Sequence, residues 1–344
     1  MSPTPSALDC TALAPGVWRI GLPFPSPLRT AFSYLVRSSS GIVAIDAGWD
    51  SDEGWETFLA GLARAGAGLE DLRGVVATHA HPDHYGLTAR IRAATGAWIA
   101  LHPAEQGQLA PTNADRARRV DSIAAWLRGC GVPDLEMAAV MADRHHLHDE
   151  LSGNLPTHDL LDGDVVPDTD GTVVAIHTPG HTPGHLVFHD RSRGIVFTGD
   201  HLLPRISVNV SARPTSGTDP LGDYLGSLDA LEPLRDALAA PGHEWAFDRI
   251  GARVDAVREH HGERLDEIRD AVAGGARTPW DVAQVVTWSR PFNTLNPRGM
   301  RSAIGETASH LIRLERAGHL AREGTTWVVA RTGDREGAGR TSPH

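Results

Sequence analysis

Residues 78–84 read Thr78-His79-Ala80-His81-Pro82-Asp83-His84 and directly follow a short apolar run that starts at Gly74. The run is typical of a buried strand, and the loop after it places four ligand-type side chains within six positions. If side chains alternate in direction, His79 and His81 point one way, while Asp83 and His84 turn to a second position beside it. Neutral imidazole and carboxylate suit zinc or a similar borderline metal. The alternative is a surface turn that is rich in histidine by chance.

Three further segments place a ligand-type residue directly after a predicted strand or helix. They are Thr178-Pro179-Gly180-His181-Thr182-Pro183-Gly184-His185, Thr198-Gly199-Asp200 and Pro241-Gly242-His243. Glycine and proline before each candidate allow tight turns that aim the side chain inward. Because four such segments occur in order, a histidine-rich surface turn that arose by chance is a poor explanation. His201 follows Asp200, so we expect it near the metals, and a contact with substrate is left open.

The rest of the first 250 residues alternates between strand-like and helix-like patterns. We expect strands at residues 17–22, 32–37, 42–45, 74–78, 97–101, 172–177, 185–189 and 195–198, and helices at residues 52–65, 85–94 and 221–239. The alternation occurs once before and once after a mostly helical insertion at residues 103–158, which suggests two sheets between outer helices. The insertion lies between two of the site-bearing loops, so it is a candidate lid.

Beyond residue 250 the pattern becomes helical. Helices expected at 249–273, 279–287 and 306–317 precede a strand pair at about 321–331, which is the order of a winged-helix domain. Residues 332–344 are rich in Gly, Arg and Ser, and we expect them to be disordered. The chain is therefore predicted to hold one domain over residues 1–250 and a winged-helix-like domain over residues 251–331.

Composition limits the partners. The 344 residues carry 43 acidic and 32 basic side chains, for a net charge of −11. Residues 1–250 hold 31 acidic residues against 18 Arg, which makes this part a poor partner for nucleic acid. Two cysteines far apart in sequence argue against a disulfide scaffold and a thiolate zinc site. With neither a signal-peptide pattern nor an 18-residue apolar run in the sequence, we expect a cytoplasmic protein without a membrane partner.

These motifs resemble the metallo-β-lactamase superfamily over about residues 15–250. The resemblance implies an αββα sandwich with a binuclear metal site at one edge of its sheets. It implies that the first metal binds His79, His81 and His181, that the second binds Asp83, His84 and His243, and that Asp200 and a hydroxide bridge the two. The ions are expected to be zinc, with iron or manganese as alternatives. His185 matches a histidine that is not usually a ligand, and we expect it to support the ligands.

The C-terminal pattern resembles a winged-helix branch of this superfamily, which includes acyl-thioesterases that act on polyketide chains and a mitochondrial endoribonuclease. Members named β-lactamase generally lack the bridging aspartate, so Asp200 argues against taking the family name as the activity. Our first hypothesis is a hydrolase in which the bridging hydroxide attacks the acyl carbonyl of a thioester, an ester or a lactone, with Asp83 and Asp200 as catalytic residues. The alternative is a metal-dependent endoribonuclease or phosphodiesterase. The acidic first domain favours the acyl hydrolase.

The expected partner is a small-molecule or carrier-bound acyl substrate. We expect Phe24, Trp49 and the apolar face of the 103–158 insertion to line its pocket, although Trp49 could equally be a core residue. The C-terminal domain is expected to bury Leu311, Leu314 and Trp327 against the hydrolase domain or a second subunit, which leaves a homodimer open. We do not expect it to bind nucleic acid.

Overall fold

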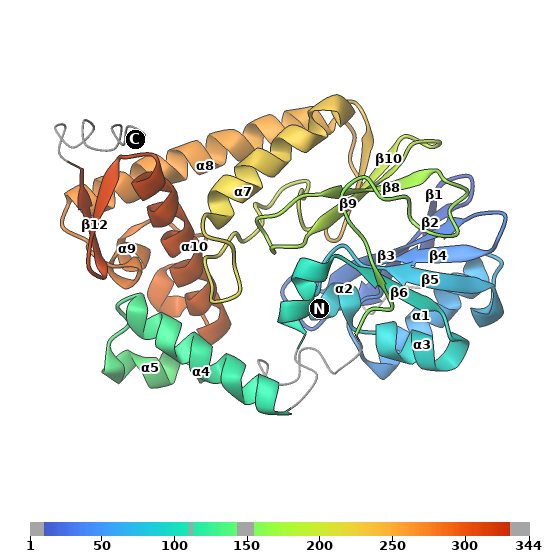
Figure 1. Ribbon diagram of the computed structural model, residues 1–344, viewed down its shortest axis with the longest axis horizontal. Coiled ribbons are helices and arrows are strands. Elements are labelled where there is room, and N and C mark those ends of the chain that lie inside the picture. Colours follow the sequence, from blue (N-terminus) through green and yellow to red (C-terminus); the bar gives the residue numbers. More distant parts are fainter. Residues whose placement is uncertain (1–9, 110–112, 143–154, 331–344) are drawn as a thin grey trace, which may run out of the picture.

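Two β-sheets lie face to face in the part of the chain that ends at Pro241 (Figure 1). The computed structural model describes residues 10–109, 113–142 and 155–330. In the first sheet, strands β1 to β4 pair antiparallel and β4 to β7 pair parallel. Its strands are β1 (Cys10–Ala14), β2 (Val17–Pro23), β3 (Thr30–Arg37), β4 (Ile42–Ile45), β5 (Leu72–Val76), β6 (Trp98–Leu101) and β7 (His158–Asp159).

The second sheet has the strand order β11-β10-β9-β8. Strands β8, β9 and β10 pair antiparallel, whereas β10 and β11 pair parallel. Its strands are β8 (Val173–His177), β9 (Leu186–Asp190), β10 (Ile195–Gly199) and β11 (Leu238–Pro241). The loops after β5, β8, β10 and β11 carry the four segments that the sequence analysis singled out.

Alternation along the strands explains why the sheets pack. On β3, Phe32 and Tyr34 are buried between the two sheets with Phe197 of β10, while Leu35 points to the opposite face. Leu35 packs there beneath Phe58 of α1 (Asp52–Arg64). Helix α3 (Thr88–Thr95) covers the same outer face, and α7 (Pro220–Ser227) and α8 (Ile250–Ala273) cover the outer face of the second sheet. The predicted αββα sandwich is confirmed.

Several predicted elements have different bounds. The helix predicted at 221–239 is confirmed only in its first part: α7 ends at Ser227, a 3-10 turn covers Leu228–Leu234, and β11 begins at Leu238. Pro233 lies inside that turn and lacks an N–H group, and the fully buried Ala239 and Ala240 pair with β10 instead. The helix predicted at 85–94 is two, α2 (Pro82–Tyr85) and α3.

After the sandwich, the chain forms α8, α9 (Pro279–Val285) and α10 (Pro297–Arg316), then a hairpin of β12 (Leu320–Glu323) and β13 (Thr326–Val329). Helix α10 begins nine residues before the predicted helix, since Asn296 caps it and Pro297 occupies its first turn. Leu311, Leu314 and Trp327 are buried, but against α8 and α9 rather than against the sandwich. The division into domains at residue 250 stays a prediction, and residues 332–344 lie outside the described part.

The two described α-helices of the insertion pack against the C-terminal helices. A 3-10 turn at Pro103–Gln108 precedes α4 (Asn113–Gly129) and α5 (Asp134–Val140), which lie beneath the C-terminal helices (Figure 1). Leu127 and Val140 pack against Trp280 and Ile304 of those helices. The prediction that the apolar face of the insertion lines a substrate pocket is therefore wrong for α4 and α5, because that face is already buried. Residues 143–154 of the insertion lie outside the described part. Among the described residues, no helix is both long and apolar enough to cross a bilayer.

Candidate metal centre

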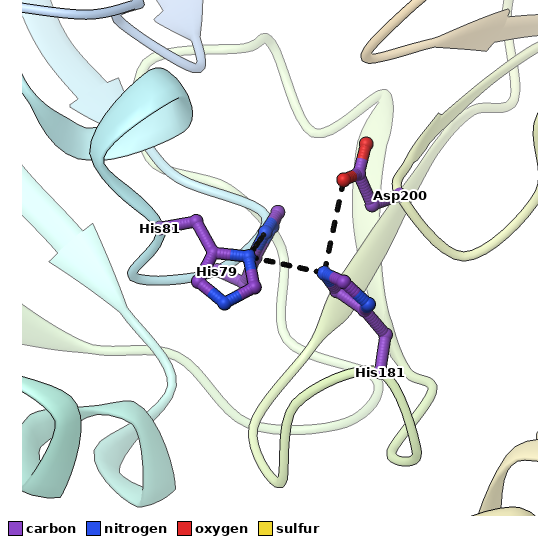
Figure 2. A group of neighbouring side chains, drawn as sticks. All are labelled: His79, His81, His181 and Asp200. Atoms are coloured by element: carbon purple, nitrogen blue, oxygen red, sulfur yellow. Dashed lines mark hydrogen bonds and ion pairs between the residues drawn. The ribbon is translucent and has the colours of Figure 1, made fainter. Parts of the chain in front are cut away.

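The structure brings together the seven side chains that the sequence analysis named as metal ligands. They form two groups, and within each group the candidate ligand atoms lie within 4.8 Å of one another. The first group is His79, His81, His181 and Asp200, and the second is Asp83, His84 and His243 (Figure 2 draws the first). Part of the first group is accessible to solvent, whereas all three members of the second are buried. The first group is therefore the more accessible of the two.

Nitrogen atoms converge in the first group. His79 Nε2 lies 2.8 Å from His81 Nδ1, which lies 3.1 Å from His181 Nε2 (Figure 2). The other ring nitrogen of His181, Nδ1, lies 2.8 Å from the backbone oxygen of Asn209. Because a carbonyl oxygen only accepts, Nδ1 carries the proton, and the Nε2 lone pair of His181 points at its neighbours. Converging lone pairs of this kind are the donor set that a cation requires.

Asp200 lies between the two groups. Its Oδ2 is 3.7 Å from His181 Nε2, and its Oδ1 is 3.5 Å from His84 Nε2 and 3.5 Å from His243 Nε2. One carboxylate oxygen thus faces each group. This is the arrangement expected of a carboxylate shared by two cations.

The second group has fixed tautomers as well. His84 Nδ1 lies 2.8 Å from Asp46 Oδ2, and His243 Nδ1 lies 2.8 Å from the backbone oxygen of Thr30. Both imidazoles therefore donate from Nδ1 and direct Nε2 inward. His84 Nε2 and Asp200 Oδ1 are buried and have no hydrogen-bond partner among the described residues. Orphaned buried atoms of this kind are costly unless a cation satisfies them, so the residues present fit a pair of metal ions.

The charge states suit ligands. Burial lowers the pKa of His79 and His81 well below the usual value, so both imidazoles are neutral. Burial alone would raise the pKa of Asp83, but His84 and His243 outweigh it and lower the pKa to about 2. The histidines of the first group are therefore neutral, the form in which imidazole binds a metal, whereas in the absence of a cation the neighbouring carboxylates raise the pKa of His84 and of His243 against the effect of burial.

Two buried acids that hold the ligand loops were not identified from the sequence. Asp46, at the end of β4, has a left-handed backbone (φ 60) and accepts from Thr78 N at 2.7 Å as well as from His84. Glu105 is fully buried and accepts from Ala80 N at 2.8 Å and from Gly184 N at 2.7 Å. One carboxylate thus ties the loop of His79 and His81 to the loop of His181. The only sequence signal for Asp46 was its position directly after an apolar strand. The sequence carried no signal for Glu105.

His185 and His201, the two additional histidines named in the sequence analysis, do not belong to either ligand group. His185 Nε2 accepts from the backbone N–H of Asp200 at 3.2 Å, so His185 holds the main chain that carries the shared carboxylate. His201 is fully buried, with its ring 5.1 Å from that of Tyr224. Burial lowers the pKa of His201 to about 3, so the ring is neutral. A side chain without exposed surface does not contact a substrate in this conformation.

Phe24 and Trp49 lie beside the second group. The ring of Phe24 is 5.8 Å from that of His243 and 5.7 Å from that of Trp49. Phe24 is buried and Trp49 is half-buried. An apolar wall therefore flanks His243, and its contact with a substrate stays a prediction.

Comparisons with known proteins agree with this geometry. The sequence pattern of the metallo-beta-lactamase superfamily matches residues 27–243. The chain is 26% identical over 301 residues to the "Probable metallo-hydrolase YqjP" of Bacillus subtilis (strain 168), across 86% of this chain and 91% of that relative. It is 29% identical over 259 residues to the acyl-coenzyme A thioesterase MBLAC2 of Homo sapiens, across 72% of this chain and 85% of that protein.

A solved structure has a similar fold. The crystal structure of a beta-lactamase domain protein from Burkholderia ambifaria matches with a TM-score of 0.81 and 27% identity, and the match covers 95% of this chain and 96% of that one. The superfamily pattern itself spans more than half of the chain and every one of the seven ligand positions. The chain therefore belongs to the metallo-beta-lactamase superfamily and is a hydrolase of that family.

Proposed function

We propose that this protein uses two divalent metal ions, zinc by preference, to hydrolyse an acyl thioester or ester. The observation that carries the proposal is the pair of ligand groups joined by Asp200, whose two oxygens face different groups. Five histidines and two aspartates form a donor set that suits zinc, with iron or manganese as alternatives. When bound, such a pair of cations lowers the pKa of a shared water and stabilises negative charge on oxygen.

The chain's own residues supply position and charge. Asp83 Oδ2 lies 3.1 Å from His243 Nε2, which leaves the other oxygen of Asp83 to orient the attacking water or take up its proton. Asp46 fixes the imidazole of His84, and His185 fixes the backbone of Asp200, so the site does not have to reorganise during the reaction. Phe24 and Trp49 keep one side of the site apolar.

A small-molecule or carrier-bound acyl group is the substrate class that we propose. The relative MBLAC2 is named an acyl-coenzyme A thioesterase, and it aligns with most of this chain. The acidic composition of residues 1–250 supports the same choice, because a polynucleotide would need a basic track. A lactone presents the same electrophilic carbonyl and is the nearest variant of this proposal.

The test is a substrate panel run on the zinc-loaded protein. It contains acyl-coenzyme A thioesters of several chain lengths, aryl esters, lactones and single-stranded RNA. We expect thiol release from at least one thioester at a rate that Asp200→Ala reduces by more than 100-fold. Metal-dependent cleavage of RNA without turnover of any acyl substrate would contradict the proposal and favour the endoribonuclease alternative.

A further inference from the structure

A loop of the hydrolase domain connects the metal centre to helix α10. It follows β10 and covers residues 206–212, and its Asn209 accepts the Nδ1 proton of His181 on the backbone oxygen at 2.8 Å. That bond fixes the tautomer of His181 and the direction in which its Nε2 points. The position of the Asn209 carbonyl therefore determines the orientation of His181, one of the three imidazoles of the first group.

Helix α10 holds this loop from the other side. The Asn209 side-chain Nδ2 donates to Glu306 Oε2 at 3.2 Å and to the backbone oxygen of Ser302 at 3.4 Å. Ser211 donates to Asn209 Oδ1, and the backbone N–H of Ala212 donates to the oxygen of Gly305 at 3.0 Å. The Asn209 side chain is thus engaged through both its donor and its acceptor.

The contact between loop and helix is close because of Gly305. A Cβ atom added at this position would lie 2.7 Å from Ser211 Oγ, so any larger residue would push the loop away from the helix. Gly305 lies inside α10, where glycine lowers helix stability. Its presence there is explained by the close approach of the loop.

We propose that Asn209 and Glu306 are positioning residues for His181, so that α10 of the C-terminal domain is part of the support of the metal centre. The proposal rests on the proposed function in one respect, which is that His181 binds a cation. It gives the C-terminal domain a role that does not involve nucleic acid. Partners that orient a metal-bound histidine change metal affinity by roughly 10–100-fold when they are removed.

The first test is Asn209→Ala in the full-length protein, with zinc affinity measured by competition against a chromophoric chelator. We expect one of the two zinc ions to bind at least 10-fold more weakly and the other to be unchanged, since the ligand that Asn209 hydrogen-bonds, His181, belongs to the first group. Asn296→Ala is the matched control, because Asn296 lies at the start of the same helix and caps it by accepting from Gly299 N. It should lower stability and leave both zinc affinities as they are.

Glu306 gives a second pair of variants. Glu306→Gln keeps an acceptor oxygen for Asn209 and should bind zinc like the wild type, whereas Glu306→Ala should weaken the same single ion as Asn209→Ala. Glu315→Ala is the control on α10, where Glu315 accepts from Trp327 Nε1 and lies away from the loop. The proposal is wrong if Asn209→Ala binds both ions as the wild type does, or if the two control variants weaken zinc binding equally.

A readout on the metal-free protein separates this proposal from the proposed function. The ring proton on His181 Nδ1 should exchange slowly with solvent in the wild type and rapidly in Asn209→Ala, as followed by NMR. If the wild type binds no zinc at all, the proposed function fails, and the exchange rates still decide whether α10 positions His181. Equal exchange in the wild type and in Asn209→Ala would overturn the positioning role.

Discussion

Glu105 shows how a single residue can join two parts of a metal site without belonging to it. Its two carboxylate oxygens accept from Ala80 N and Gly184 N, which lie in different ligand loops and more than 100 residues apart. Each bond is to a buried backbone N–H group, which is costly to leave without an acceptor. The spacing between the loop of His79 and the loop of His181 therefore depends on this side chain.

Replacing Glu105 by Gln tests this role. The amide oxygen of glutamine can still accept from one of the two backbone N–H groups. The amide NH2 group would face the other N–H, so a buried backbone donor would be left without an acceptor. We expect a loss of stability of about 2 kcal/mol and a loss of zinc affinity of roughly 10-fold. Urea unfolding of the metal-free protein and chelator competition measure the two quantities. Glu259→Gln, at an exposed position of α8, should change neither.

The seven ligand-type residues could be named from the sequence because they cluster in short loops at the ends of strands, and five of them directly follow a glycine, a proline or another ligand. Asp46 and Glu105 could not, because the groups they contact are distant in sequence. Thr78 is 32 residues from Asp46, and Gly184 is 79 residues from Glu105. Local sequence patterns identify the metal-ligand side chains of a loop. They do not show which buried acid, distant in sequence, holds that loop in place.

At the scale of elements, the errors fall where tertiary contacts override local preference. Residues 221–239 have a helical pattern, but the segment ends as β11 because Ala239 and Ala240 fill the space beside β10. The described helices of the insertion show a similar effect, since the apolar faces of α4 and α5 pack against α9 and α10; the role of the insertion as a lid stays a prediction. An apolar face predicts that something covers it, and the sequence does not say which element does so.

Glu306 on α10 gives a pH prediction. Burial raises its pKa from 4.5 to about 7, although Arg264 and the hydrogen bond from Asn209 oppose the shift. The unfolded chain therefore loses this proton at lower pH than the folded protein, and Glu306 destabilises the fold increasingly as the pH rises from about 4.5 to about 7. Relative to the wild type, Glu306→Gln should become more stable across this window, by somewhat less than ~1.4 kcal/mol per pH unit because the residue keeps some solvent access.

Urea unfolding of the metal-free wild type and of Glu306→Gln at pH 5 and pH 7.5 measures this difference. Glu263→Gln, which is exposed on α8, is the control and should follow the wild type at both pH values. A difference between Glu306→Gln and the wild type that does not grow with pH would show that Glu306 is not destabilising in its ionised form.

At the scale of the whole molecule, the charges oppose binding to nucleic acid. Residues 1–250 are strongly acidic, and two of the four arginines of α10 are engaged within the protein. Arg301 is buried and donates to the oxygen of Val140, and Arg313 pairs with Asp219 at 3.2 Å. The arginines that could face phosphates are therefore partly used to attach α10 to the insertion and to α7.

We accordingly expect no useful affinity for single-stranded RNA or duplex DNA, even at low salt where electrostatic attraction is least screened. Fluorescence anisotropy of labelled oligonucleotides with the zinc-loaded protein measures this affinity. Micromolar or tighter binding that weakens steeply with added salt would contradict the expectation, and it would do so decisively if it were accompanied by metal-dependent cleavage.

The central claim is that two metal ions, held by the two ligand groups that share Asp200, make this chain an acyl hydrolase. It is tested most directly by titrating the chelator-stripped protein with zinc while thiol release from an acyl-coenzyme A is followed. We predict no turnover without zinc, and a rate that reaches its plateau when about two zinc ions are bound per chain, one for each ligand group. Full thiol release by the metal-free protein, or a fully loaded protein that leaves thioesters and esters intact, would contradict the account.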